Sequence, residues 1–154
     1  MRRVALSALI VFALDQITKL LVVFGLDLAN RGEIDVIPPL LNFRMAWNYG
    51  INFGLLSGQT EVTRWLLIGL ALAISGWVWV WTSRNKHGEW ARISAGVLIG
   101  GALGNVVDRV AYGAVADFLN MSCCGIENPY AFNVADIAIF IGAVWYHRRA
   151  MSAA

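Results

Sequence analysis

The stretch ISAGVLIGGALGNVVDRVAY, residues 93–112, decides the fold class of this chain. It is mainly apolar and close to the ~20 residues that an α-helix needs to cross a membrane. Small residues at every fourth position let membrane helices pack closely, and this stretch has such a series of glycines: Gly96, Gly100 and Gly104. It also carries Asp108 and Arg109, although a charge within a span costs at least ~2.5–3.5 kcal/mol. The stretch therefore predicts a closely packed membrane span whose charges need a compensating role.

The composition extends the membrane interpretation to the whole chain. Of 154 residues, 58% are hydrophobic and 14% are charged, whereas soluble domains have roughly 25% charged residues. Segments of span length cover residues 4–26, 62–82, 93–112 and 130–147. We therefore predict a single integral membrane domain over residues 1–154 with four transmembrane helices.

The basic residues predict the orientation of these spans. Those near the span ends fall on one side of the predicted membrane: Arg2, Arg3, Arg84, Lys86, Arg92, Arg148 and Arg149. Because basic residues are enriched in cytoplasmic loops, we expect both termini in the cytoplasm. The net charge of +2 reflects this topology. A nucleic-acid partner is not expected, since that would need a basic face on a soluble surface.

The first outer connection contains a predicted strand. In residues 41–48, LNFRMAWN, apolar residues alternate with mainly polar ones, which is typical of a half-buried strand. Residues 51–59 fit either a short interfacial helix or more strand. The predicted fold is therefore an all-α membrane protein with four transmembrane helices and a small extracytoplasmic β-sheet.

Ionisable residues within the predicted spans gather at one membrane face. With the amino terminus in the cytoplasm, all of them fall in the outer half of the bilayer: Asp15, Lys19, Asp108, Arg109 and Asp136. Such clustering indicates a polar site at the outer face. It argues against a proton-coupled transporter, whose site would lie near the midplane. A small structural subunit would explain the glycines but not the buried charges.

Elimination narrows the chemistry of that site. His87 and His147 both fall on the cytoplasmic side, so no imidazole is available for a metal site or a nucleophilic pair at the outer face. We expect no metal and no cofactor. Cys123 and Cys124 could form a strained vicinal disulfide or pair with other chains, but we favour two small loop residues without a role.

A pair of aspartates remains. Asp117 follows the third span and Asp136 opens the fourth, and the chain between them must turn back at the outer face. Two close carboxylates share a proton, so that one can act as base on water and the other as acid on a carbonyl. The alternative is helix capping or solvation, since a carboxylate in a first turn suits the helix dipole. We expect Asp136 to be ionised for that reason and Asp117, in a loop, to be protonated.

Ordered sequence blocks resemble those of one family. They are DQITK at 15–19, NYGINFG at 48–54, GGALGNVVDR at 100–109, VADF at 115–118 and FNVAD at 132–136. In this respect the chain resembles the lipoprotein signal peptidase family, bacterial signal peptidase II. The resemblance implies that Asp117 and Asp136 are catalytic. It assigns a substrate-binding or supporting role to Asp15, Lys19, Asn48, Gly50, Gly104, Asn105, Asp108, Arg109 and Asn133.

The supporting residues also have a physical interpretation. Asp15 and Lys19 are four apart, the spacing of an intrahelical ion pair. Asn105 and Asp108 lie three apart, and we expect hydrogen bonds from them to the aspartates or to substrate. We expect Arg109 to brace the outer loops through Asp108 or a backbone carbonyl. Departures from the family pattern are Asn52, Ile137 and the two adjacent cysteines, which bear on substrate preference.

The resemblance implies an aspartic endopeptidase of the bacterial inner (plasma) membrane. Its substrates would be diacylglyceryl-modified prolipoproteins, cut before the lipidated cysteine, with membrane lipids as its other partners. The acyl chains could supply binding energy at ~0.8 kcal/mol per buried methylene. We expect a monomer with its active site at the outer face.

Overall fold

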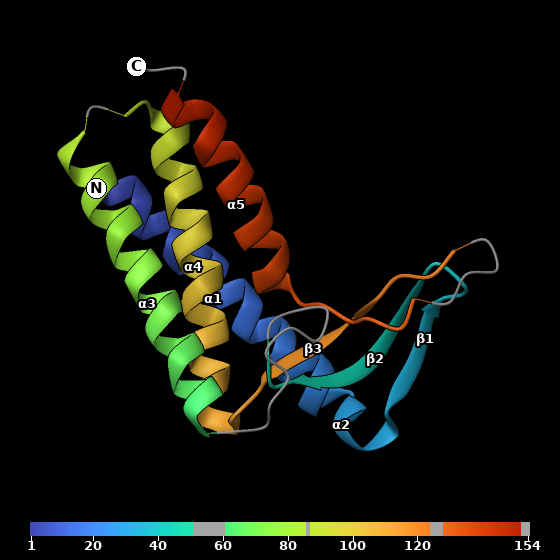
Figure 1. Ribbon diagram of the computed structural model, residues 1–154. Helices are drawn as coiled ribbons and strands as arrows, with labels where there is room; N and C mark the ends of the chain where they lie inside the picture. Colours follow the sequence, from blue (N-terminus) through green and yellow to red (C-terminus); the bar gives the residue numbers. More distant parts are fainter. Residues whose placement is uncertain (51–60, 86, 124–127, 152–154) are drawn as a thin grey trace.

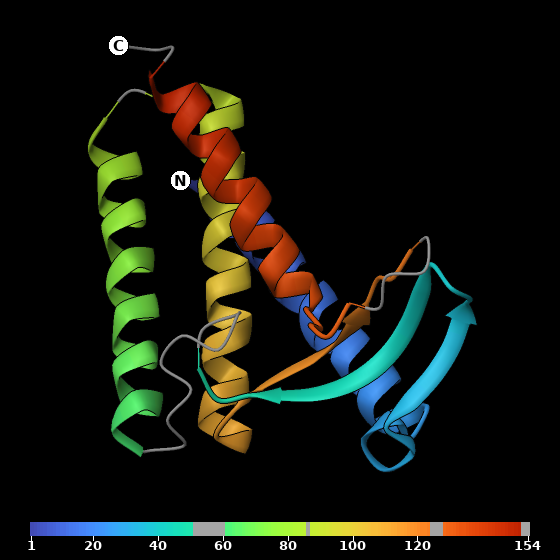
Figure 2. The ribbon, with the colours of Figure 1, turned by 45° about the vertical axis from the view of Figure 1, so that its right-hand side comes forward.

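The computed structural model describes residues 1–50, 61–85, 87–123 and 128–151, so the expectation for residues 51–59 lies outside it. Its elements are α1 (Arg2–Lys19), the π-helix η1 (Leu20–Gly25), α2 (Leu28–Arg31), β1 (Glu33–Ile37), β2 (Leu41–Asn48), α3 (Glu61–Arg84), α4 (Glu89–Tyr112), β3 (Val115–Asn120) and α5 (Val134–Met151). Four long helices form a bundle, and the sheet extends to one side at the end where α4 ends and α5 begins (Figures 1 and 2). The predicted class, a helical membrane protein with a small sheet, is confirmed.

Among the described residues, three helical segments are long and apolar enough to cross a membrane: Arg2–Gly25, Glu61–Arg84 and Glu89–Tyr112. Helix α5 is not among them, because its 18 residues include Asp136, Arg148 and Arg149. Its role as a fourth span therefore stays a prediction. The helix packs along α4 over much of its length, and α1 begins and α5 ends towards the same end of the bundle (Figure 1).

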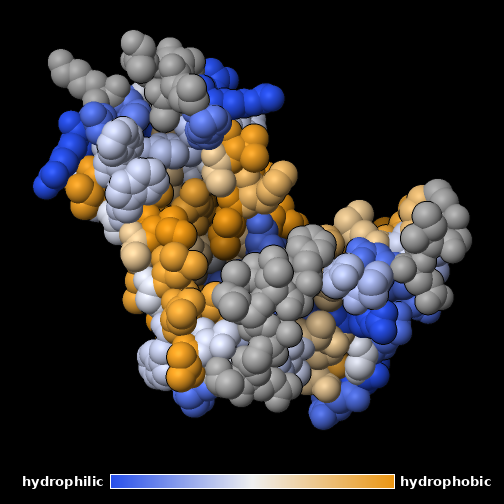
Figure 3. All heavy atoms as spheres, in the orientation of Figure 1, coloured by the Kyte–Doolittle hydropathy of each residue, from blue (hydrophilic) through white to orange (hydrophobic). Residues whose placement is uncertain are grey.

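The outward faces of the helices are apolar. Large hydrophobic side chains are exposed along α1 and α3, among them Leu9, Leu14, Ile17, Trp65, Leu66 and Leu72. Figure 3 shows hydrophobic residues over the middle of the bundle and hydrophilic residues towards its far end and over the sheet. Apolar surface of this extent needs a partner. On helices of span length that partner is lipid.

Helix α4 is the centre of the bundle, and glycine allows the close contacts that it makes. A Cβ at Gly96 or Gly100 would collide with the backbone carbonyl of Val4 or Ala8 on α1. On another face of α4, a Cβ at Gly101 would lie 2.6 Å from the carbonyl oxygen of Ala135 on α5. The glycine series therefore serves helix packing, as the sequence predicted.

The sheet is antiparallel, in the order β1-β2-β3. Strand β2 has the predicted bounds, residues 41–48. Strand β3 packs one face on η1 and α2, where Phe118 and Ala116 lie buried against Val23 and Leu28. The remaining alternate positions of β3 face the other way, and Asp117 is one of them.

The chain returns from β3 to α5 along the strand. Phe132 pairs with Leu119, with its N–H 2.9 Å from the Leu119 carbonyl and its own carbonyl accepting the Leu119 N–H at 2.8 Å. The predicted start of the fourth span at residue 130 is therefore wrong, because residues 130–133 precede the helix, which begins at Val134. The signal for this boundary was Asn133, whose side chain caps the helix.

Candidate active site

Asp117 lies in strand β3 and is buried, with 2% of its surface exposed. The prediction that it sits in a loop is therefore wrong. Asn48 pairs with Val115 across the β2–β3 ladder, which places it diagonally opposite Asp117 on the same face. From there its Nδ2 donates to Oδ2 of Asp117 at 3.0 Å. The sheet register thus sets one partner of this carboxyl group.

Asp136 lies in the first turn of α5, as predicted, and is half-buried. It forms a reciprocal cap with Asn133: its N–H donates to Oδ1 of Asn133 at 2.9 Å, and its Oδ2 accepts the Asn133 N–H at 3.3 Å. Its Oδ1 accepts a hydrogen bond of 2.9 Å from Nδ2 of Asn105 on α4. The predicted contact of Asn105 with an aspartate is confirmed.

Asn133 joins the two aspartates. While its Oδ1 caps Asp136, its Nδ2 donates to Oδ1 of Asp117 at 2.7 Å. This side chain therefore ties the carboxyl group of Asp117 on β3 to the backbone of Asp136 on α5, although the two residues are 19 positions apart in sequence. Burial first, and the negative charge of Asp136 second, raise the pKa of Asp117 to about 8. A pKa in this range favours the protonated form of Asp117 at neutral pH.

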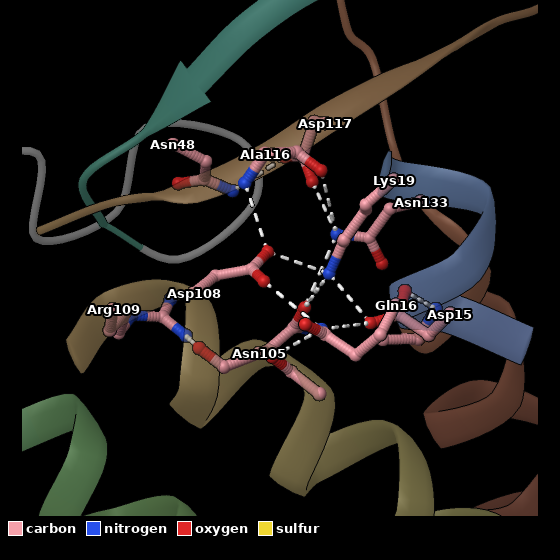
Figure 4. A network of polar contacts seen from close by, with 12 residues as sticks. Asp15, Gln16, Lys19, Asn48, Asn105, Asp108, Arg109, Ala116, Asp117 and Asn133 are labelled. Carbon is pink, nitrogen blue, oxygen red and sulfur yellow. Dashed lines mark hydrogen bonds and ion pairs between the residues drawn. The ribbon is translucent and has the colours of Figure 1, made fainter. Parts of the chain in front are cut away.

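Lys19 connects α1 to α4 beneath this pair. Its Nζ lies 2.8 Å from Oδ2 of Asp15, as the spacing predicted, and 2.6 Å from Oδ2 of Asp108 (Figure 4). Gln16 donates to both carboxylates as well, at 3.1 Å to Asp15 and 3.2 Å to Asp108. Gln16 was not among the predicted site residues, although its place in the DQITK block was a signal. Gly104 makes room for this cluster, because a Cβ there would collide with the carboxylate of Asp15.

Arg109 braces the segment that follows β2. Its Nη2 donates to the carbonyl of Gly50 at 2.9 Å, which confirms the backbone-carbonyl alternative. The Gly50 N–H in turn donates to Oδ1 of Asn48 at 3.1 Å. Asp108 instead accepts the backbone N–H of Ala116 at 3.2 Å. Its side chain thus binds the backbone next to Asp117 and not the carboxyl group of either catalytic candidate in the described residues, and a bond from Asp108 to substrate stays a prediction.

An apolar groove reaches Asp136. Its volume is about 450 Å³, and it runs between α3, α4 and α5. Its polar lining comes from the sheet end of the bundle, where Asn105, Arg109 and Asp136 contribute. Its apolar lining continues along the helices, with Leu67, Leu70, Ala71, Ile74, Leu98, Ala102 and Ile139. A mainly apolar pocket with a few convergent polar groups is typical of a binding site.

The described residues offer little support for metal or cysteine chemistry. In the described ranges, no group of three or more His, Cys, Asp or Glu residues could hold a metal ion. Cys123 is disulfide-bonded, so the preference for a small loop residue without a role over a disulfide is wrong, while Cys124 lies outside the described residues. A protonated carboxyl group beside a second carboxyl group, at the end of an apolar groove, can perform acid and base catalysis on a polar bond of an apolar substrate.

The fold and the site together define a membrane enzyme. A bacterial membrane enzyme solved by the in meso method at 2.3 Å resolution superposes with a TM-score of 0.81 and 27% sequence identity, covering 99% of this chain and 89% of that chain. A second such structure, at 1.9 Å resolution, gives a TM-score of 0.79 over 96% of this chain and 92% of the other. At 24% identity, the second likeness concerns the fold alone.

The sequence comparisons name the family. A family model described as signal peptidase (SPase) II matches residues 7–151. A lipoprotein signal peptidase of Rhodopseudomonas palustris is 39% identical over 89% of this chain and 84% of its own length. One from Pseudomonas aeruginosa is 39% identical over 88% of this chain and 79% of its own length. The chain therefore belongs to the signal peptidase II family, and the transporter and scaffold alternatives find no support.

Proposed function

We propose that this protein is an aspartic endopeptidase that removes signal peptides from diacylglyceryl-modified prolipoproteins, cutting before the lipidated cysteine. The observation that carries the proposal is the unit of Asp117, Asn133 and Asp136, where one side-chain amide binds the carboxyl group of Asp117 and the backbone N–H of Asp136. The negative charge of Asp136 also raises the pKa of Asp117. Two neighbouring carboxyl groups can share a proton, which is the requirement for aspartic-peptidase chemistry. The relatives named above are lipoprotein signal peptidases, which supports the substrate class.

The raised pKa of Asp117 supports the following division of roles. Protonated Asp117 donates its proton to the carbonyl oxygen, while ionised Asp136 takes a proton from the water that attacks the carbonyl carbon. The resulting gem-diol collapses as Asp136 passes its proton to the leaving amine, the C–N bond breaks, and a hydroxyl proton returns to Asp117. The products are a carboxylic acid and an amine, and both aspartates end in their starting states.

The groove supports a lipid-bearing substrate. Its apolar lining offers contacts for a signal-peptide helix and for acyl chains, each buried methylene contributing ~0.8 kcal/mol. Contacts remote from the cut bond can position it, so the local sequence at the bond needs few specific contacts. Arg109 and Asn105 line the groove near Asp136 and have donors suited to peptide carbonyls.

The proposed setting is the bacterial inner membrane, with α5 as the fourth span, both termini in the cytoplasm and the site at the outer face. The distribution of basic residues supports this orientation. Both aspartates and their amide partners come from one chain, which supports a monomer as the active form.

The test is cleavage by purified protein in detergent. The substrate is a synthetic peptide with a diacylglyceryl-cysteine, and mass spectrometry locates the cut. We expect cleavage before the cysteine, and loss of at least 10³-fold in turnover for Asp117→Asn and for Asp136→Asn, which keep the size of the side chain. The unlipidated peptide and the Asp35→Asn variant, altered on exposed β1, are the controls. Undiminished turnover in either aspartate variant would refute the shared-proton mechanism.

A further inference from the structure

Lys19 forms buried ion pairs with both Asp15 and Asp108. These three residues are called the ion bridge below. The side chains of the bridge are almost fully buried, with exposed fractions of 5% for Lys19, 0% for Asp15 and 1% for Asp108. Taking charges out of water costs several kcal/mol per ion, so a buried ion group is an inefficient way to stabilise a fold. Its presence therefore calls for a role beyond stability.

Each carboxylate of the ion bridge accepts one backbone N–H from outside its own helix. Oδ1 of Asp15 accepts the N–H of Ala135 at 3.0 Å, and Oδ2 of Asp108 accepts the N–H of Ala116 at 3.2 Å. Figure 4 shows the second of these bonds and the position of Lys19 between the two carboxylates. Ala135 immediately precedes Asp136 in sequence, and Ala116 immediately precedes Asp117. Asp15 and Asp108 thus each bind the backbone N–H of the residue that immediately precedes a candidate catalytic aspartate.

We propose that the ion bridge is a positioning device that fixes the spacing of Asp117 and Asp136 by holding the backbone N–H group that precedes each of them. This inference rests on the proposed function, because the spacing matters for turnover only where both aspartates take part in the reaction. The members of the bridge do not touch the reacting atoms; they are positioning residues.

The need for such a device follows from the architecture. Asp117 belongs to a strand and Asp136 to a helix, so their relative position depends on how β3 docks against α5. Asn48 and Asn133 bind the carboxyl group of Asp117, and Asn133 also donates to the carbonyl of Ala116 at 3.4 Å. These contacts and the pairing of Phe132 with Leu119 join β3 to the start of α5. A misplacement of about 1 Å can cost ~10²-fold in rate. The ion bridge anchors both backbones to α1 and α4, which approach each other closely at Gly96 and Gly100.

A matched pair of variants separates the backbone anchor from the charge. Asp108→Asn and Asp108→Ala remove the same negative charge, but only Asn keeps an oxygen acceptor. In wild type, Oδ2 of Asp108 receives both Lys19 and Ala116, so one amide oxygen can replace it. The amide nitrogen then faces Gln16, whose own amide can turn to present its oxygen.

The two variants are compared with wild type by kcat and KM on the lipidated peptide and by thermal unfolding in detergent. We expect Asp108→Ala to lower kcat by about 10²-fold with KM within threefold, since the groove is lined by other residues. We expect Asp108→Asn to lose less than tenfold in kcat. Equal losses of kcat in both variants, or changes confined to KM or to the unfolding temperature, would overturn the proposal.

The other half of the bridge keeps the test decisive where Asp108→Ala does not fold. Asp15→Asn keeps an oxygen for the N–H of Ala135, but its amide nitrogen replaces the oxygen that accepts Lys19. This pair is therefore judged by whether Asp15→Ala loses more kcat than Asp15→Asn. Asp35→Ala, which removes an exposed carboxylate on β1, is the charge control. Asp136→Asn is the reference: substantial turnover in that variant refutes the proposed function. An inactive Asp136→Asn with indistinguishable Asn and Ala pairs refutes only the positioning role.

Discussion

The side-chain amide of Asn48 donates a hydrogen bond of 3.0 Å to Oδ2 of Asp117 from the neighbouring strand. A donor of this kind favours the ionised carboxylate, so it lowers the pKa of Asp117. Burial first, and the charge of Asp136 second, act in the opposite direction and bring the pKa to about 8. Substituting Asn48 should therefore change the pKa of Asp117 without altering the carboxyl group itself.

Removing that donor should move the pH profile of the enzyme. The acid role requires protonated Asp117, which loses its proton as the pH rises through about 8, so activity should fall on the alkaline side near that value. In Asn48→Ala the pKa rises, and we expect the alkaline limb of kcat/KM to shift to higher pH. Asn30→Ala, which alters an exposed amide on α2, should leave the limb in place. A shift of the Asn48→Ala limb to lower pH would contradict this account.

Infrared difference spectra should identify the protonated carboxyl group. Because burial is the main cause of the raised pKa of Asp117, its acid band should persist near neutral pH when Asp136 is replaced. We expect the band to vanish in Asp117→Asn and to remain in Asp136→Asn. The reverse pattern would exchange the acid and base roles of the two aspartates.

Gly104 should be intolerant of even one added carbon. A Cβ there collides with the carboxylate of Asp15, so Gly104→Ala should destabilise the protein by about 1–3 kcal/mol and lower its turnover. Gly69→Ala in α3 is the matched control, since a Cβ at that position meets nothing within 4 Å. Thermal unfolding in detergent and turnover on the lipidated peptide measure both effects. Equal tolerance at the two glycines would show that α1 and α4 can move apart without cost.

Cysteine labelling should reveal the orientation of the chain in the membrane. In a variant with Cys123 and Cys124 replaced by serine and shown to be active, Ser83→Cys should react with an impermeant reagent only from the cytoplasm. Asp35→Cys should react only from outside. Both positions are exposed, one at the end of α3 and the other on β1. Labelling from the opposite sides would place the aspartates at the cytoplasmic face and exclude the proposed setting.

The sequence predicted most of the fold because its signals were local. Strand β2 was identified at its observed bounds by alternation, and the glycine series indicated the contact of α4 with its neighbours. The start of α5 was misplaced, since hydrophobicity continues through Phe132 although that residue pairs with β3. The cap at Asn133 was a readable signal that apolar patterning alone concealed.

The sequence predicted which residues form the candidate site, but not most of the contacts between them. The spacing of Asp15 and Lys19 gave their ion pair, because both lie on one helix. The bond from Ala135 to Asp15 spans 120 positions, and no sequence period connects residues so far apart. The placement of Asp117 in a strand was missed as well, because VADF is short and its neighbours on η1 and α2 are distant in sequence.

The glycines on two faces of α4 also limit which substitutions the protein can accept. Every change in the first or second base of a glycine codon replaces the residue, so mutation at Gly100, Gly101 or Gly104 adds atoms to a helix contact that has no space for them. The outward faces of α1 and α3 can exchange one apolar residue for another without such a penalty. Inherited variation should therefore accumulate on the lipid-facing surface. A compound bound against α4 would therefore contact a surface whose glycines can hardly be substituted without disturbing the helix contacts.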